Sequence, residues 1–380
     1  MKIAHLAPRI ESVPPQLYGG TERSVSYLTE QLVRAGHEVT LFASGDSTTA
    51  AQLVPCVPRA LRLGRGAMEP LPHMVLQVEH VRQRADEFDI LHFHVDMLHF
   101  PVFRSSRHRT LTTLHGRLDS PEIAPLFREF RELPCVSISN TQRGPLPDIN
   151  WVRTVYHGIP QTVAGAWPNP RGDYLAFVGR ISPEKRPDRA IAIAKRAGIK
   201  LRIAAKVDAA DRDYYEREIK PQLDHPLIEY IGEIGDASKA EFVGNALALI
   251  FPIAWPEPFG LVMIEAMALG TPVIAYRHGS VPEIIDEGVS GFVVENEDQA
   301  IMALRKALTL DRQRVYEQYL QRFTAERMAR EYCSVYQSLL AQESHKGAHR
   351  AVAGWRMKEE VTRHRALLAA PVELPADASG

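Results

Sequence analysis

Short apolar runs alternate with helical patterns along the chain, and this alternation is the feature that most constrains the fold. An apolar run of about four to eight residues fits a buried strand, whereas apolar residues spaced three or four apart fit a helix with one buried face. Strands that alternate with helices pair in parallel and are covered by helices on both faces. The sequence therefore predicts an α/β fold made of doubly wound sheets.

Five strands are expected in the first half of the chain. They are Lys2–Ala7, His37–Ala43, Asp89–Val95, Arg109–His115 and Cys135–Ser139. A long loop after the first strand contains Gly19 and Gly20, and Thr21 is then positioned to N-cap a helix. Gly36 stands where that helix should end. The stretch Val54–Pro72 is rich in proline, arginine and glycine, and we expect it to be irregular.

A second series of strands and helices begins after a linker. The segment Ala164–Gly172 combines two prolines with two glycines and is the expected boundary. The later strands are Tyr174–Gly179, Lys200–Ala205, Leu227–Ile231, Leu247–Ile253 and Thr271–Tyr276. The later helices are Pro187–Ala197, Asp211–Leu223, Phe259–Leu269 and Thr324–Gln342. Doubly wound sheets bind ligands at the carboxyl ends of their strands, so two facing domains would share one deep cleft.

The composition fits an enzyme of two domains and narrows the class of partner. The 380 residues include 45 Lys and Arg and 46 Asp and Glu, so the net charge is −1. The chain therefore lacks the excess of basic residues that is typical of a nucleic-acid-binding protein. Three widely spaced cysteines indicate no disulfide framework. The N-terminus reads as a strand rather than a signal peptide, and no run approaches the ~20 apolar residues of a membrane span. We expect a cytoplasmic protein with at most peripheral contact at the inner membrane face.

The most informative segment is Trp255–Val273, which reads as a tight loop, a helix, a glycine stop and a strand. The loop brings the backbone N–H groups of Phe259, Gly260 and Leu261 to a helix N-terminus. Such groups have no partner inside the helix and bind anions and sugar oxygens. Glycine at 260 lets a ligand approach the backbone closely. The segment therefore predicts a binding site for an anionic or hydroxyl-rich ligand.

Two glutamates in this segment suit the two ends of one long ligand. Glu257 lies just before the helix and Glu265 lies inside it, eight residues on. That separation corresponds to about 12 Å of helical rise. A nucleotide sugar offers hydroxyl groups at both ends, on the sugar and on the ribose.

This pattern resembles the E-x7-E motif of the retaining glycosyltransferases of family GT4, which have the GT-B fold. The resemblance extends over about residues 1–340 and includes a G-x-x-P-E turn at Gly279–Glu283. It implies that Glu257 contacts the hydroxyls of the donor sugar and that Glu265 contacts the ribose. It also implies retention of configuration at the transferred sugar.

Two cations follow the first strand of the second series. Arg180 and Lys185 stand on a polar loop after that strand, where a bidentate guanidinium and a compact ammonium suit a diphosphate. In GT4 enzymes the matching residues hold the donor diphosphate, so they would stabilise the leaving nucleotide in place of Mg²⁺. The resemblance puts the donor between the loops near Arg180, Lys206 and Gly232 and the helix that starts at Phe259.

Further donor and acceptor contacts are expected from the first half. The loop with Gly19 and Gly20 precedes a helix N-terminus and resembles the family loop that closes over the donor. His115 matches a family position near the donor sugar and the acceptor hydroxyl, and His94 matches a looser position on the acceptor side. A histidine at a strand end is also a common hydrogen-bonded structural residue, so that reading stays open for both.

The resemblance implies three parts of the chain with different roles. Residues 1–165 would form an acceptor-binding Rossmann-like domain, completed by the last helix at about 324–342, and residues 170–323 would bind the nucleotide sugar. Residues 344–380 form a basic tail that we expect to be flexible, with a weak interfacial or partner contact as the alternative.

The predicted activity is transfer of a sugar, with UDP favoured as the donor nucleotide, to a saccharide, glycolipid or small-molecule hydroxyl. No metal or other cofactor is expected: the triplet Asp211–Asp213 reads as a helix start rather than a metal grip. Two alternatives stay open, a nucleotide-sugar 2-epimerase or other GT-B enzyme such as a phosphorylase, and a non-catalytic nucleotide-sugar binder.

Overall fold

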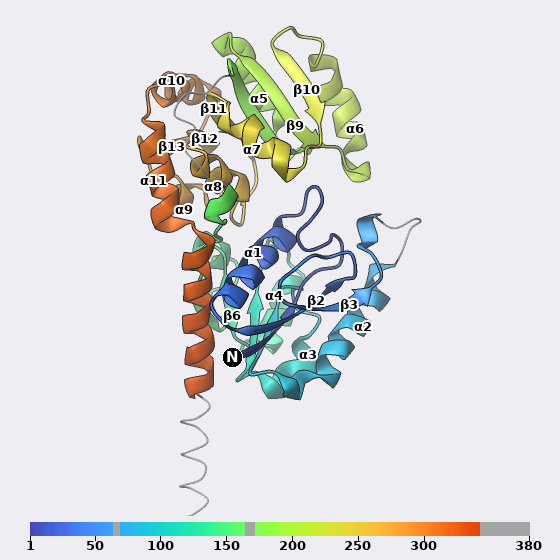
Figure 1. Cartoon of the computed structure of the whole chain (residues 1–380). Coiled ribbons are helices and arrows are strands. Elements are labelled where there is room, and N and C mark those ends of the chain that lie inside the picture. Colours follow the sequence, from blue (N-terminus) through green and yellow to red (C-terminus); the bar gives the residue numbers. More distant parts are fainter. Residues whose placement is uncertain (64–68, 164–171, 343–380) are drawn as a thin grey trace, which may run out of the picture.

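A computed structural model describes residues 1–63, 69–163 and 172–342 and shows two parallel sheets, one in each half of the chain (Figure 1). The first sheet has seven strands in the order β3-β2-β1-β4-β5-β6-β7. Its strands are β1 Lys2–Leu6, β2 Glu38–Ser44, β3 Gln52–Val57, β4 Ile90–Phe93, β5 Thr110–Thr113, β6 Cys135–Ser137 and β7 Trp151–Thr154.

The second sheet repeats the same winding with six strands in the order β10-β9-β8-β11-β12-β13. Its strands are β8 Tyr174–Arg180, β9 Lys200–Lys206, β10 Ile228–Gly232, β11 Ala248–Phe251, β12 Val273–Tyr276 and β13 Gly291–Val294. In each sheet the order reverses beside its first strand, between β1 and β4 and between β8 and β11. A ligand site is expected at such a switch point, outside the carboxyl ends of the strands.

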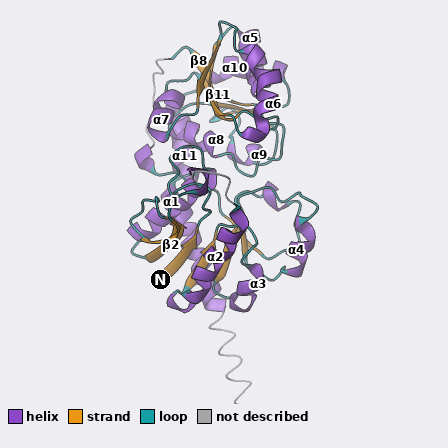
Figure 2. Ribbon diagram, turned by 90° about the vertical axis from the view of Figure 1, so that its right-hand side faces the viewer, coloured by secondary structure: helices purple, strands orange, loops and turns teal. Residues whose placement is uncertain are grey.

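Helices cover both faces of each sheet (Figure 2). In the first half they are α1 Gly20–Arg34, α2 Pro70–Gln83, α3 Phe100–Phe103 and α4 Ile123–Glu129. In the second half they are α5 Pro187–Ala197, α6 Arg212–Tyr214, α7 Asp236–Gly244, α8 Leu261–Ala268, α9 Val281–Ile284, α10 Glu297–Ala307 and α11 Arg312–Arg322. A final helical segment, residues 325–342, runs down along the first half (Figure 1).

The alternation of side chains along β1 explains how two layers of helix form on one strand. Ile3 packs with α1 and with the last helix, whereas Ala4 and Leu6 pack on the opposite face against α2. The last helix contributes Tyr332 and Tyr336 to the first of these layers, and both side chains are almost fully buried. The chain therefore returns from the second half to complete the core of the first.

The structure corrects three details expected from the sequence. Gly19, rather than Thr21, is the N-cap of α1, and it provides no side-chain cap. The stretch Val54–Pro72 is not irregular throughout, because it contains most of β3 and the start of α2. The polar helix expected over Asp211–Leu223 is broken into short α, π and 3₁₀ turns. Pro221 lacks an N–H and cannot continue a regular helix there.

Helix and strand ends are otherwise close to expectation. Helix α5 runs from Pro187 to Ala197 and ends on Gly198, which has φ +68. The linker expected at Ala164–Gly172 and the tail 344–380 lie, apart from Gly172, outside the described residues. Within the described ranges, no helix combines the length and apolarity needed to cross a bilayer.

Candidate active site

A cleft of about 1020 Å³ lies where the carboxyl ends of the two sheets face each other. It receives loops from both switch points, after β1 in the first half and after β8 and β11 in the second. Nine of the residues expected at the site line this cleft: Gly19, Gly20, His115, Lys185, Glu257, Phe259, Gly260, Leu261 and Glu265. Residues far apart in the sequence are thus brought to one place.

The tight turn before α8 needs glycine. Gly260 is the N-cap of α8 and has φ +78, a backbone conformation that residues with a side chain rarely adopt. A Cβ at this position would also lie 2.8 Å from Cε of Met263. The turn directs the first amides of α8 into the cleft, where Gly20 meets it: a Cβ on Gly20 would lie 3.5 Å from a methyl carbon of Leu261. Two helix N-termini, those of α1 and α8, therefore approach each other across the cleft.

Glu257 is held by cationic and aromatic neighbours. Its Oε2 atom contacts Nζ of Lys185 and accepts a hydrogen bond from Nε1 of Trp255 at 2.8 Å. The Lys185 ammonium also lies 4.8 Å from the centre of the Trp255 ring. Only 9% of Glu257 is exposed, so its charge is balanced locally rather than by water. Lys185, which is expected to bind the diphosphate, and Glu257, which is expected to contact the donor sugar, are therefore adjacent.

The backbone of Glu257 rests on the G-x-x-P-E turn. Gly279 has φ +55, and a Cβ there would overlap the carbonyl oxygen of Glu257. The amide of Ser280 donates to that same carbonyl at 3.0 Å, and the Ser280 hydroxyl donates to the carbonyl of Phe259 at 2.8 Å. This turn thus holds the backbone of the loop that carries Glu257 in place.

Glu265 lies on α8 at the other end of the cleft. Its Oε1 atom is 2.7 Å from Nζ of Lys239 on α7 and 4.0 Å from Nε of Arg23 on α1. Arg23 comes from the first half of the chain and Lys239 from the second. A carboxylate that contacts side chains of both halves is well placed to bind a ligand that lies between them.

His115 and His157 line the first-half wall of the cleft, and His94 lies behind them. His94 Nδ1 and His115 Nε2 are 2.9 Å apart, and the His115 ring stacks on His157, which meets Phe259 edge to face. Burial lowers the pKa of His115 to about 3 and holds the pKa of His94 and His157 well below the ordinary value. All three rings are therefore neutral at physiological pH, and they act as hydrogen-bonding groups rather than as cations.

Among the described residues, His5, His92 and His94 bring ligand atoms within 4.8 Å of one another. Hydroxyl groups already bond both nitrogens of His5 and both nitrogens of His92; they belong to Thr29, Tyr336 and Thr113. Only the Nε2 atom of His94 is left without a partner in this trio. The arrangement fits a hydroxyl-bonded core better than a metal site, and it lies on the sheet rather than at the α8 turn.

Arg180, Gly232 and His94 do not line this cleft. The Arg180 guanidinium turns to three carboxylates instead: Glu184 at 3.4 Å, Asp208 at 3.8 Å and Asp211 at 3.3 Å. The expected pairing of Arg180 with Lys185 on one diphosphate is thus not the arrangement seen. Gly232 has φ +76 at the end of β10 and delivers the next residue, Glu233, to the cleft.

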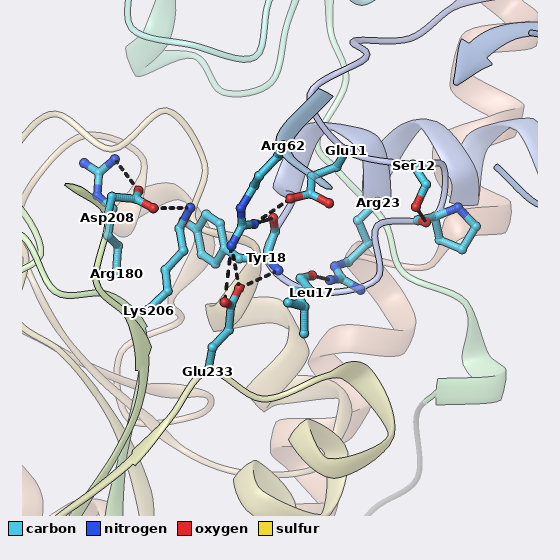
Figure 3. Close-up of polar contacts among 11 residues, drawn as sticks. Glu11, Ser12, Leu17, Tyr18, Arg23, Arg62, Arg180, Lys206, Asp208 and Glu233 are labelled. Carbon is cyan, nitrogen blue, oxygen red and sulfur yellow. Dashed lines mark hydrogen bonds and ion pairs between the residues drawn. The ribbon is translucent and has the colours of Figure 1, made fainter. Parts of the chain in front are cut away.

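Direct contacts tie the two halves together at the rim of the cleft (Figure 3). Arg62 of the first half binds Glu11 and reaches across to Glu233 of the second half at 3.2 Å. The amide of Tyr18 donates to the same Glu233 at 3.1 Å, and the Lys206 ammonium lies 4.7 Å from the centre of the Tyr18 ring. The loop with the two glycines is therefore held against the second half.

Sequence reasoning missed several of these groups. Arg23, Arg62, Lys239 and Glu233 sit in no recognisable motif, and α7, which carries Lys239, was not expected. His157 follows β7, a strand that was also not expected. Only the three-dimensional arrangement shows that they face the same cleft.

Two parallel sheets of Rossmann-like winding that share a cleft match the GT-B fold, which is the fold of one class of glycosyltransferases. Solved structures agree with this fold. Sucrose-phosphate synthase from Thermosynechococcus elongatus superposes with a TM-score of 0.73, at 19% identity over 90% of this chain and 99% of that chain. The Anabaena protein HepE, solved with UDP and glucose, gives a TM-score of 0.67 at 18% identity over 89% and 100% of the two chains.

Sequence families place the chain within this class. Residues 167–322 match the family described as glycosyl transferases group 1, and residues 18–202 match glycosyltransferase family 4. Both are families of glycosyltransferases, and together the two matches extend over residues 18–322.

Two relatives illustrate the range of similarity. A glycosyltransferase of Methanocaldococcus jannaschii is 25% identical over 78% of this chain and 87% of its own length. The D-inositol 3-phosphate glycosyltransferase of Mycobacterium marinum is 33% identical over 34% of this chain. The chain spans only 28% of the length of that second relative.

Proposed function

We propose that this protein transfers a sugar from a nucleotide diphosphate donor to a hydroxyl acceptor, with retention of configuration and without a metal ion. The observation that carries the proposal is the meeting of Lys185 and Glu257 beside the N-terminus of α8, in a cleft to which both halves contribute. An ammonium group and helix amides can bind the diphosphate of such a donor, and a carboxylate can accept hydrogen bonds from its sugar.

The diphosphate would lie on the amides at the start of α8 and against Lys185. Negative charge grows on the leaving phosphate as its bond to the sugar breaks, and oriented N–H groups with a nearby ammonium stabilise that charge. These groups would do the work that Mg²⁺ does in other transferases. Arg180 has a smaller part in this proposal, because it balances Asp208 and Asp211 at the rim.

Glu257 would accept hydrogen bonds from the donor sugar, and Glu265 from the ribose. Glu257 lies in the loop before α8 and Glu265 lies inside α8, and both line the cleft, so each can contact a different end of one nucleotide sugar. Donor binding would transfer Lys185 from Glu257 to the diphosphate. The released Glu257 oxygen would then receive a sugar hydroxyl.

His115 would mark the place where the acceptor hydroxyl meets the anomeric carbon. The bond from that carbon to the diphosphate oxygen breaks, the bond to the acceptor oxygen forms on the same face, and the acceptor proton passes to the leaving phosphate. His115 is neutral, so it would orient the reacting groups through hydrogen bonds instead of taking up this proton. Closure of the two halves limits the entry of water and therefore hydrolysis.

UDP is the favoured nucleotide. The solved neighbour from Anabaena was obtained with UDP and glucose, and its fold matches almost the whole of this chain. A thermal-shift comparison of UDP-, GDP- and ADP-sugars ranks the donors, since the ligand that binds most tightly raises the melting temperature most.

Transfer itself is tested by incubating the protein with radiolabelled UDP-sugars and mixed saccharide and glycolipid acceptors in the presence of EDTA. The expected result is release of UDP and transfer of the label to an acceptor. Neither should be reduced by the chelator. Inversion at the anomeric carbon, or a requirement for added metal, would contradict the corresponding part of the proposal.

The same incubation separates the alternatives. A 2-epimerase would convert the UDP-sugar into its C2 epimer without any acceptor, and a phosphorylase would require inorganic phosphate and yield a sugar phosphate. A non-catalytic binder would shift its melting temperature with the donor and release no UDP.

A further inference from the structure

A second cavity adjoins the cleft on the side of the first half. Its walls include the apolar residues Ile10, Leu61 and Met74 together with the carboxylate residue Asp96, and it has about 790 Å³ of open space. His115 and Thr21 line both this cavity and the cleft, so the two spaces meet at those residues. A molecule in the second cavity would therefore present a group directly at the proposed site of transfer.

The cavity contains a buried cation. Arg9 is 3% exposed, and its guanidinium donates one hydrogen bond, to the backbone carbonyl of His73. Its Nε atom is buried without a hydrogen-bond partner. Among the described residues, no carboxylate forms an ion pair with Arg9, whereas the nearby Glu11 is committed to Arg62.

Buried charges in proteins are ordinarily paired, because an isolated ion loses its hydration without compensation. His94 and His115 also line the cavity, and each has one buried nitrogen without a partner, Nε2 of His94 and Nδ1 of His115. Because the two neutral rings share one hydrogen bond, one of these two nitrogens carries a proton and the other accepts. An unsatisfied guanidinium N–H and one imidazole N–H beside the same space match a ligand group with several oxygens and negative charge. A phosphate has that shape, and a guanidinium can bind it through two parallel hydrogen bonds.

We propose that this cavity binds the acceptor and that Arg9 holds a phosphate group of it, so that the acceptor is a phosphorylated hydroxyl compound. The inference rests on the proposed transferase function and names its acceptor class. The apolar walls contact the carbon skeleton of the acceptor, and its hydroxyl points towards His115. Arg9 is thus a specificity-determining residue that does not contact the donor.

The first test uses inorganic phosphate as the probe. The protein is saturated with UDP, which fills the diphosphate site, and its melting temperature is followed as phosphate replaces chloride at constant ionic strength. Phosphate is expected to raise the melting temperature of the wild type. The absence of any phosphate-dependent rise in the UDP-saturated wild type would overturn the proposal.

Variants assign the effect to Arg9. Arg9→Met is expected to bind UDP like the wild type and to bind phosphate at least tenfold more weakly. Arg59→Met is the matched control, because Arg59 belongs to the same half but its side chain is 66% exposed, and its phosphate response should equal that of the wild type. An unchanged phosphate response in Arg9→Met would overturn the proposal.

Stability provides a readout that separates binding from a structural role. Without ligand, Arg9→Met should melt at the same temperature as the wild type or higher, because it removes an unpaired buried charge. A marked loss of stability would mean that Arg9 serves the fold and would contradict the proposal. If Arg9→Met fails to bind UDP, Arg9→Lys replaces it; lysine lacks the Nε donor, so an undiminished phosphate response there also counts against the proposal.

Acceptor assays then distinguish a free phosphate ester from a lipid headgroup. Transfer from the donor is compared for inositol and inositol 1-phosphate, for glucose and glucose 6-phosphate, and for vesicles with and without phosphatidylinositol. At least a tenfold preference for the phosphorylated member of a pair is expected, either in solution or on vesicles. Equal transfer to both members of every pair would refute the acceptor class, while the UDP release itself would leave the transferase function standing.

Discussion

The contact between Lys185 and Glu257 carries the chemical argument at the scale of single residues. Each group neutralises the other while the donor is absent, and each is expected to take a different part of the donor when it binds. A pair with two roles predicts that loss of either member harms both stability and turnover, whereas loss of both restores only stability.

Lys185→Met and Glu257→Gln are each expected to lower the rate of sugar transfer about 10²- to 10³-fold, the range known for removal of one transition-state hydrogen-bond donor. The reason is lost stabilisation of the leaving phosphate in the first variant and lost orientation of the sugar in the second. Initial rates of UDP release measure the effect.

Lys220→Met provides the control for these variants, because Lys220 pairs with Glu216 on an exposed turn far from the cleft. Its transfer rate should equal that of the wild type. The double variant of Lys185 and Glu257 should unfold at a higher denaturant concentration than either single variant yet stay inactive. Wild-type turnover in either single variant would remove both residues from the proposed mechanism.

Buried histidines make stability depend on pH. Burial lowers the pKa of each of the following below its ordinary value: His5, His92, His94, His99, His115 and His157. The unfolded chain therefore binds protons below about pH 6.5 that the folded chain does not bind. Stability is full above that pH and declines as the pH falls.

The free energy of unfolding should drop by roughly 1 kcal/mol per buried histidine between pH 7.5 and pH 5.5. Urea titrations at the two values measure it, and proton NMR of the His115 ring should show no titration above pH 5. A free energy of unfolding that stays constant over this range, or a His115 resonance that titrates near pH 6.5, would contradict the assigned burial.

The sequence could place Glu257, Glu265 and Lys185 at one site because their motifs resemble those of GT4 enzymes, and all three line the cleft. It could not identify Arg23, Lys239 or Glu233, because their roles depend on which side chains face them across the cleft. Arg180 shows the converse limit: its position after β8 is as expected, but three carboxylates supplied by nearby loops determine the direction of its side chain.

At the scale of elements, the G-x-x-P-E turn supports the loop that carries Glu257. Gly279→Ala should displace that loop, because the new Cβ would overlap the Glu257 backbone. We expect a loss of transfer of at least tenfold together with a stability cost that exceeds the roughly 1 kcal/mol of the left-handed conformation alone, because the backbone must also shift. Transfer rates and urea titrations measure the two effects separately.

Gly288→Ala is the control for this substitution. Gly288 has φ +74, but a Cβ there meets nothing within 4 Å. It should show only the cost of the left-handed conformation, which is smaller than that of Gly279→Ala, and an unchanged rate of transfer. If the two variants lost activity equally, the turn would not be positioning Glu257.

The same scale shows which elements the sequence predicted. Helix α5 was predictable to the residue, since Pro187 starts it and Gly198 ends it. Strand β3 was missed because Pro55 interrupts its apolar pattern, and it lies at the edge of the sheet, where proline is tolerated. Strand β13 was missed because Gly291 starts it, although Val273 packs closely against that glycine.

At the scale of the whole molecule, the contact of Arg62 with Glu233 holds the two halves together at the rim. Arg62→Met should favour a more open arrangement and raise the donor KM several-fold, because Glu233 and Tyr18 both line the cleft. Both side chains of the pair are about a quarter exposed, so the effect is limited to roughly 1 kcal/mol. Small-angle scattering and donor titration measure the opening and the affinity.

Arg196→Met is the matched control, since Arg196 pairs with Glu297 and Asp298 within the second half. It should change neither the radius of gyration nor the KM. An Arg62→Met protein that is as compact as the wild type and binds donor equally well would show that this contact does not set the domain arrangement.

The central claim is that a nucleotide diphosphate binds in the cleft at the start of α8. A crystal structure of the protein with UDP tests it most directly. The account predicts phosphate oxygens within about 3 Å of the Gly260 and Leu261 amides and of the Lys185 ammonium, with the ribose at Glu265. A nucleotide bound elsewhere, with Lys185 still on Glu257, would contradict it.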